Sequence, residues 1–300
     1  MKKILLLVVT FLFWSTSVFA EPITKIVFFG DSLTDNGNLY NFLHLKIIPK
    51  SPPYYEGRFS NGLAWADIAE GFFRNKYNIE SANYAVGGAT VELLNPFEGN
   101  LPYVMNQEVD DYLLRSTWSD RRNTLFVIWV GANDYTGGRS NIDSATTGVV
   151  NSITGTITNL IQKHGARNFL VMNLPDLSKI PYAKTVTFSD QLHDMSVMHN
   201  TKLAQSIAKL KNEYRNTRFA YVDTFDIFDD LIAHPEKFNQ RYNKHFQNTF
   251  ESCWKGGYSL QGKNKKQEVN ELSVEIAKAM TNRNLGKKVD PQKMANFILN

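Results

Sequence analysis

The chain has 300 residues, of which 43% are hydrophobic and 21% are charged, and its formal net charge is +4. These values are typical of a globular protein with one large α/β domain or two small ones, and no repeat or low-complexity segment interrupts it. A single cysteine, Cys253, excludes an intramolecular disulfide, and the six histidines show no spacing typical of a metal site. We expect no metal, no cofactor and no nucleic-acid partner.

The N-terminus has the pattern of a secretory signal peptide. Lys2 and Lys3 precede an apolar run over residues 4–14, and Val18-Phe19-Ala20 has the small outer residues that signal peptidase needs. We therefore predict a signal peptide over residues 1–20 and a protein that is secreted or periplasmic. The alternative is a membrane anchor, but the apolar run is shorter than the ~20 residues needed to span a bilayer.

Short apolar runs alternate with stretches of helical periodicity along the rest of the chain. The runs predict strands at 24–29, 79–86, 125–130, 168–173 and 218–222. The stretches between them predict helices at 62–74, 103–115, 143–163 and 196–213, and residues 35–61 form a long, apolar loop punctuated by prolines. This alternation is typical of a mainly parallel sheet with helices on both faces.

The polar turn after the first strand contains a candidate nucleophile. Gly30-Asp31-Ser32-Leu33 places a serine at the carboxyl end of a strand, where open α/β sheets bind ligands. A helix that began here would direct free N–H groups and its positive dipole end toward an anionic intermediate. The alternative is that Ser32 only caps a helix or shapes a turn.

Two further polar turns follow the second and third strands. They contain Gly87-Gly88 and Gly131-Ala132-Asn133-Asp134. Because the carboxyl ends of parallel strands meet at one rim, we expect Ser32, Gly87 and Asn133 to lie together. Taken singly, the glycines also fit an ordinary turn, and Asn133 also fits a helix cap.

These stretches, in this order, resemble the conserved blocks of the GDSL, or SGNH, hydrolases of lipids and other esters. Residues 58–62 look like a further stretch of that family, and the resemblance covers about residues 25–254. It implies a three-layer α/β/α sandwich with a mainly parallel five-stranded sheet. It also implies that Ser32 is the nucleophile, that Gly87 and Asn133 form the oxyanion hole with the Ser32 N–H, and that Asp31 and Asp134 support them.

The histidine block of the family, Asp-x-x-His-Pro near the C-terminus, is not found. In the closest alignment Lys287 stands where the aspartate should be and Asp290 where the histidine should be. Asp190-Gln191-Leu192-His193 has the Asp-x-x-His spacing in a different chain order, so His193 and Asp190 are kept as candidates for the base. His199 resembles a family position outside the triad and is interpreted as structural.

The C-terminal residues 255–300 are basic, with nine Lys/Arg against four Asp/Glu. Residues 268–280 predict an amphipathic helix, and we expect this segment to complete the hydrolase domain of residues 21–254. The positive charge fits contact with an anionic membrane surface, and it also fits a solvated helical face.

The leading hypothesis is an exported serine esterase that acts on acyl esters of lipids, as a lysophospholipase, phospholipase A or acyltransferase. The apolar loop at 35–61 favours it, because such a loop beside the nucleophile can line an acyl chain. Two alternatives stay open. One is a catalytically impaired relative that binds lipid or a partner, which the missing histidine block favours, and the other is a carbohydrate O-acetyl esterase.

Overall fold

The computed structural model describes residues 22–42, 46, 48–92, 104–116 and 120–254, together with Asn270, Ser273, Val274, Ala277, Lys278 and Gln292. The expected signal peptide, Lys287 and Asp290 lie outside the described residues, as does most of the basic segment 255–300. Within the described part of the chain, no helix is long and apolar enough to cross a membrane.

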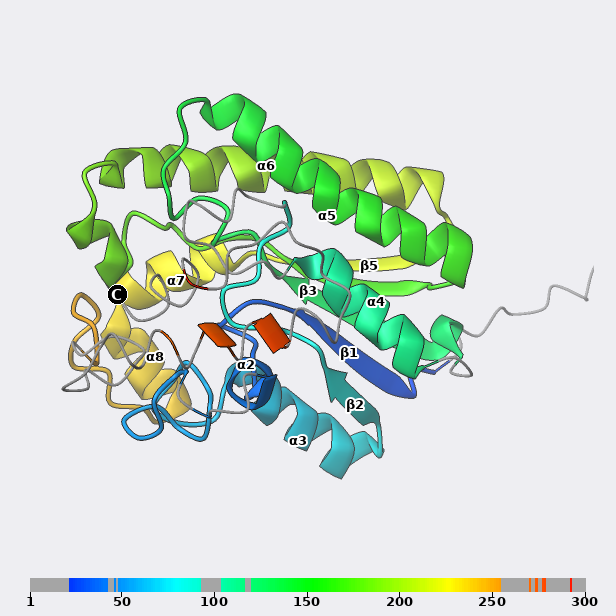
Figure 1. Cartoon of the computed structure of the whole chain (residues 1–300), viewed down its shortest axis with the longest axis horizontal. Helices are drawn as coiled ribbons and strands as arrows, with labels where there is room; N and C mark the ends of the chain where they lie inside the picture. Colours follow the sequence, from blue (N-terminus) through cyan, green and yellow to red (C-terminus); the bar gives the residue numbers. More distant parts are fainter. Residues whose placement is uncertain are drawn as a thin grey trace, which may run out of the picture.

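The described strands form one parallel sheet of five, in the order β2-β1-β3-β4-β5 (Figure 1). The strands are β1 (Lys25–Gly30), β2 (Glu80–Asn83), β3 (Thr124–Trp129), β4 (Asn168–Met172) and β5 (Arg218–Val222). Gly30 is paired with Trp129 at the ends of β1 and β3. The turns after these two strands therefore leave the sheet at the same level, as the sequence analysis predicts for Ser32 and Asn133.

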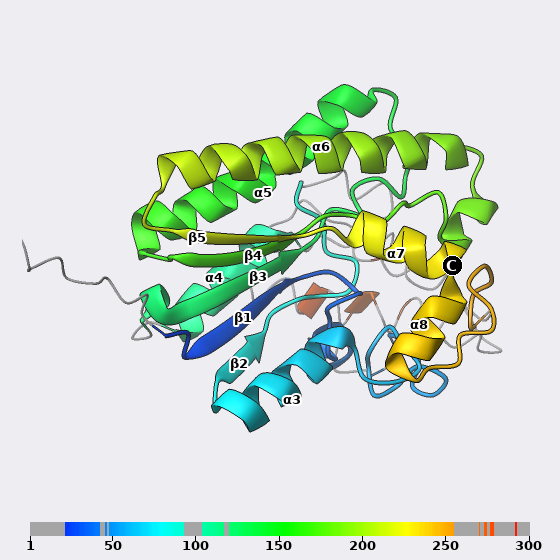
Figure 2. The same ribbon diagram turned by 180° about the vertical axis from the view of Figure 1, so that it is seen from behind.

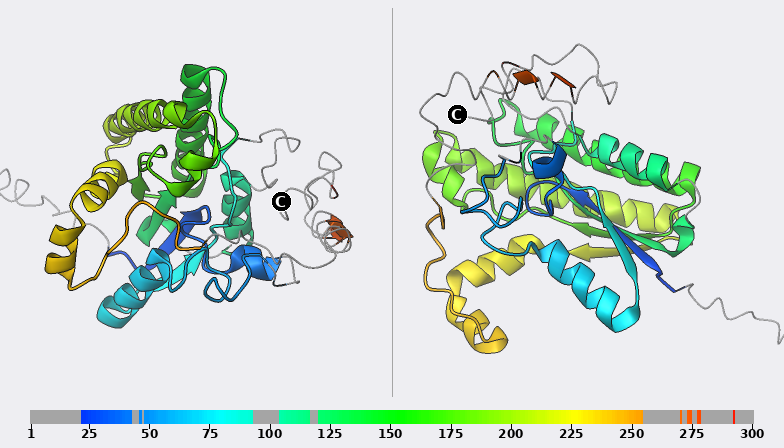
Figure 3. Two further views of the ribbon diagram at one scale, coloured as in Figure 1. Left: turned by 90° about the vertical axis from the view of Figure 1, so that its left-hand side faces the viewer. Right: turned by 60° about the horizontal axis from the view of Figure 1, so that its bottom comes forward.

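Helices cover both faces of the sheet and give a three-layer α/β/α sandwich, which confirms the expected fold class (Figure 2). One face carries α4 (Met105–Arg115), α5 (Ile142–His164) and α6 (Ser189–Glu213), and the other carries α3 (Trp65–Tyr77) and α7 (Thr224–Ala233). The Trp129 ring, which contacts Trp65 of α3 and Phe228 of α7, shows that these two helices share a face. The short helices α2 (Asn38–Phe42) and α8 (Pro235–Tyr242) lie toward the carboxyl ends of the strands (Figure 3).

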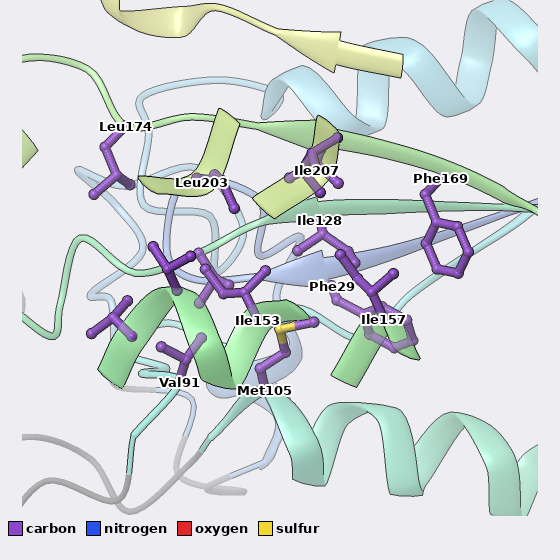
Figure 4. Close-up of a cluster of buried hydrophobic side chains, with 14 of the residues drawn as sticks. Phe29, Val91, Met105, Ile128, Ile153, Ile157, Phe169, Leu174, Leu203 and Ile207 are labelled. Carbon is purple, nitrogen blue, oxygen red and sulfur yellow. The ribbon is translucent and has the colours of Figure 1, made fainter. Parts of the chain in front are cut away.

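The larger hydrophobic core lies between the sheet and the α4–α5–α6 layer (Figure 4). Aromatic rings stack across neighbouring strands here, with centroids 6.2 Å apart for Phe29 and Phe126, 5.6 Å for Phe126 and Phe169, and 5.4 Å for Phe169 and Phe219. Because side chains alternate along a strand, the neighbours of Phe29 on β1 face the other way. On that face Ile26 and Phe28 of β1 pack with Val127 of β3 and Ala66 of α3 in a smaller core.

Three of the described α-helices were not expected from the sequence. Helix α2 lies within the predicted loop 35–61, while α7 and α8 follow β5, where no element was predicted. Helix α6 begins at Ser189, seven residues before the predicted start at 196. Its buried face begins with Leu192 and Met195, before the predicted start, and continues through His199.

Candidate active site

Ser32 lies on a tight turn that begins where β1 ends. The backbone N–H groups of Thr34 and Asp35 donate to the carbonyl oxygen of Asp31 at 3.0 and 2.9 Å, and the Leu33 N–H donates to Asp31 Oδ1 at 3.0 Å. Burial raises the pKa of Asp31 to about 7, against the effect of the Leu33 N–H. Ser32 is half-buried, and neither its hydroxyl nor its N–H is hydrogen bonded to a described residue. Asp31 thus shapes the turn and leaves Ser32 unengaged.

The glycine loop after β2 contacts the Ser32 turn. The Gly87 N–H donates to Asp35 Oδ2 at 2.7 Å, so it is already engaged. A Cβ at Gly87 would lie 2.2 Å from Phe59 Cε2, which explains the glycine by packing. The N–H of Gly88 (φ +80°) has no hydrogen-bond partner among the described residues. Because the Gly87 N–H is engaged and the Gly88 N–H is not engaged by a described residue, we propose Gly88 in place of Gly87 as the backbone donor.

The Asn133-Asp134 turn after β3 holds the same glycine loop from the other side. Asn133 Nδ2 donates to the carbonyl oxygen of Ala89 at 2.9 Å, and the amide has a second hydrogen. The buried Asp134 carboxylate accepts from the N–H groups of Val91, at 3.1 Å, and Glu92, at 3.1 Å. Burial raises the pKa of Asp134 to about 7, although these N–H groups act to lower it. The three polar turns therefore meet, as expected.

His193 forms a hydrogen bond with a carboxylate, but not with the expected one. Its Nδ1 lies 2.8 Å from Oδ2 of Asp176, whereas Asp190 is exposed on the first turn of α6 and has no described contact with His193. Of the two candidates for the base, His193 is thus oriented by Asp176 and not by Asp190, because the imidazole extends from α6 to the loop after β4. Burial tends to raise the pKa of Asp176, but hydrogen bonds from Ser178 and His193 outweigh it and lower this pKa.

His199 is buried inside the larger core region. Its Nδ1 lies 2.8 Å from the hydroxyl of Tyr135, and its Cε1 lies 3.2 Å from where a Cβ on Gly131 would be. Burial lowers the pKa of His199 to about 3, so the ring is neutral at ordinary pH. His199 thus packs behind the Asn133 turn, in agreement with a structural role. In the described part of the chain, no group of three His, Cys, Asp or Glu side chains could hold a metal ion.

Sequence reasoning missed three buried carboxylates near these turns. They are Asp35, Glu108 and Asp176. Asp176 had a usable signal, since it follows the carboxyl end of β4 as Ser32 follows β1. Glu108 had none, because one acid on a helix with several acids gives no sign that it is buried.

Comparison with known proteins identifies the family. The model of the GDSL-like lipase/acylhydrolase family matches residues 26–276. The chain belongs to this family. Membership confirms the resemblance seen in the sequence and the predicted GDSL-type hydrolase class.

Three bacterial relatives are similar over most of this chain. The phosphatidylcholine-sterol acyltransferase of Aeromonas hydrophila is 31% identical over 242 residues, which cover 78% of this chain and 67% of that protein. The secreted effector protein SseJ of Salmonella typhimurium is 32% identical over 213 residues, covering 70% and 49%. The thermolabile hemolysin of Vibrio parahaemolyticus is 28% identical over 236 residues, covering 75% and 51%. This GDSL-family chain thus spans about half the length of the last two.

Proposed function

We propose that this chain is an exported serine esterase that cleaves acyl esters of lipids through an acyl-enzyme on Ser32. The observation that carries the proposal is the meeting of three turns, which brings a serine together with two hydrogen-bond donors, none of them engaged by a residue that the structure describes. The donors are the Gly88 N–H and the second hydrogen of Asn133 Nδ2. A serine nucleophile with fixed donors is the arrangement that acyl transfer requires.

In the proposed reaction, Ser32 Oγ attacks the ester carbonyl carbon while a base takes its proton. The carbonyl oxygen becomes an oxyanion, which the N–H groups of Ser32 and Gly88 and the amide of Asn133 stabilise. Collapse of this intermediate breaks the ester bond, the alcohol leaves with a proton from the base, and the acyl group stays on Ser32. Water or a second alcohol then receives the acyl group.

His193 is the candidate base that the described contacts support best. Its bond to Asp176 orients the ring and leaves Nε2 to accept a proton, as the histidine of a serine hydrolase does. The strand β3 separates β1 from β4, so the ends of these strands are about 10 Å apart. Proton transfer requires about 3 Å between Nε2 and the serine oxygen. The proposal therefore requires Nε2 of His193 to come within this distance of Ser32 Oγ in the substrate complex.

A lipid substrate is supported by the surroundings of the glycine loop. The Phe59 ring packs against Gly87 and lies 6.3 Å from the Tyr54 ring, and Leu33, next to the nucleophile, is 44% exposed. These apolar groups could line an acyl chain at the site. Two relatives also support lipid chemistry and export, since one is a phosphatidylcholine-sterol acyltransferase and another a secreted effector protein.

The proposal is tested by fatty-acid release from a long-chain lysophosphatidylcholine by residues 21–300. Wild type should release fatty acid. The Ser32→Ala variant, shown by circular dichroism to be folded, should release it at least about 1,000-fold more slowly. Equal rates for the two would contradict the esterase function. Faster cleavage of an acetylated xylan would instead favour the carbohydrate esterase.

The same assay tests whether His193 is the base that accepts the proton of Ser32. His193→Ala should lower the rate as Ser32→Ala does, and Asp176→Asn should lower it too, because the ring would lose its orientation. Asp190→Asn is the matched control, since this exposed carboxylate has no contact with His193. Wild-type rates in His193→Ala would exclude His193 as the base and leave the Ser32 proposal intact.

A further inference from the structure

A buried carboxylate on α4 joins the two turns of the proposed site. Glu108 has no exposed surface, and its two oxygens accept from different segments. Oε2 accepts from the N–H of Gly30 at 2.9 Å, two residues before Ser32, and Oε1 accepts from the N–H of Val86 at 3.2 Å, two residues before Gly88. One side chain therefore bridges the backbone leading to the nucleophile and the backbone leading to the oxyanion donor, beside a direct bond from the Val86 N–H to the carbonyl oxygen of Gly30 at 3.1 Å.

A second buried carboxylate strengthens the same connection. Asp35 Oδ2 accepts from the N–H of Gly87 at 2.7 Å and from that of Leu39 at 3.2 Å. Its Oδ1 accepts from the N–H groups of Gly37 and Asn38 at 2.8 and 2.6 Å. Asp35 thus ties the start of α2, just beyond the Ser32 turn, to the glycine loop.

Burial of Glu108 is unfavourable by itself. Removing a carboxyl group from water raises its free energy by several kcal/mol, and an apolar residue on the inner face of α4 would avoid this. Burial accordingly raises the pKa of Glu108, although the N–H groups of Gly30 and Val86 act to lower it. The hydrogen bonds to these two backbone segments offset the cost of burying Glu108. Packing of the larger core alone does not require a carboxylate at this position.

We propose that Glu108 is a positioning residue that fixes the spacing between Ser32 and the Gly88 N–H. The proposal rests on the esterase function above. Oxyanion stabilisation depends on donors held within tenths of an ångström, and an error of about 1 Å can lower a rate about 100-fold. Loosening this bridge should therefore slow the chemical step and leave ground-state binding of the ester unchanged.

Two substitutions separate the contributions of the two oxygens. Glu108→Gln keeps the shape but has one acceptor oxygen, so one of the two hydrogen bonds to Glu108 is lost, although the Val86 N–H keeps its bond to the carbonyl oxygen of Gly30. Glu108→Met is similar in size and loses both. With p-nitrophenyl butyrate as substrate, kcat should fall about 10-fold in the first variant and about 100-fold in the second, with KM within about 2-fold of wild type. The control is Asp110→Asn, an exposed acid of the same helix, which should leave kcat unchanged.

Amide hydrogen exchange tests the bridge even if wild type cleaves no ester. Peptides that include Gly30 and Val86 should exchange at least about 10-fold faster in Glu108→Met, while peptides from α5 should keep the wild-type rate. Unchanged exchange around Gly30 and Val86 would overturn the proposal, as would faster exchange spread evenly over the chain, which marks general destabilisation. An inactive wild type with locally faster exchange would reject the esterase function and keep the bridge. A loss of kcat in Asp110→Asn equal to that in Glu108→Gln would also overturn the positioning role.

Discussion

We propose two tasks for the side-chain amide of Asn133. One hydrogen of Nδ2 holds the carbonyl oxygen of Ala89, and the other is available to an oxyanion. A neutral amide suits this position, because a carboxylate there would repel the developing negative charge. The contact with Ala89 also fixes the direction of the second hydrogen, so the donor is oriented before substrate binds.

Replacing Asn133 should therefore damage catalysis much more than folding. Asn133→Ala removes an oxyanion donor, and we expect kcat to fall about 100- to 1,000-fold with little change in KM. The measurement is steady-state hydrolysis of p-nitrophenyl butyrate, with Asn151→Ala, an exposed asparagine of α5, as the control. A kcat within 3-fold of wild type would remove Asn133 from the oxyanion hole.

At the scale of elements, buried carboxylates connect the loops that follow the strands. Asp35 joins α2 to the glycine loop, and Asp134 joins the turn after β3 to the same loop. Burial raises the pKa of Asp35 to about 6, and that of Asp31 and Asp134 to about 7, against the N–H groups that they accept from. The loops of the site are thus held by groups that bind protons more tightly in the folded protein.

This predicts that the protein is more stable in mild acid. Between about pH 4 and pH 7, the folded protein keeps protons on these carboxyls that the unfolded chain has released, so stability falls as the pH rises through this window. The free energy of unfolding, measured with urea, should be larger at pH 5.5 than at pH 8. Asp134→Asn should reduce this difference, while a larger stability at pH 8 in wild type would contradict the assignment.

The sheet could be predicted from the sequence, but much of the site chemistry could not. β3 is a nearly continuous apolar run, which is typical of a parallel strand buried on both faces, and it occupies the expected place. The partner of His193 was missed because spacing along α6 does not tell which way an imidazole extends. The engagement of the Gly87 N–H by Asp35 could not be predicted either, because a sequence does not show which N–H groups are already hydrogen bonded.

At the scale of the whole molecule, the two faces of the sheet are covered unequally. Three helices pack on one face, while α3 and α7 cover the other, where Ile68 and Phe72 of α3 are 61% and 51% exposed. Most of the apolar burial that stabilises the fold therefore lies on the α4–α5–α6 side.

That residues 255–300 complete the domain remains a prediction.

The central claim is that Ser32 forms a covalent acyl intermediate, and labelling tests it most directly. Residues 21–300 would be treated with a fluorophosphonate, which reacts with activated serines, and the modified peptide identified by mass spectrometry. The account predicts one adduct, on Ser32, and none on folded Ser32→Ala. An adduct on another residue, or an unmodified wild type with native circular dichroism, would contradict it.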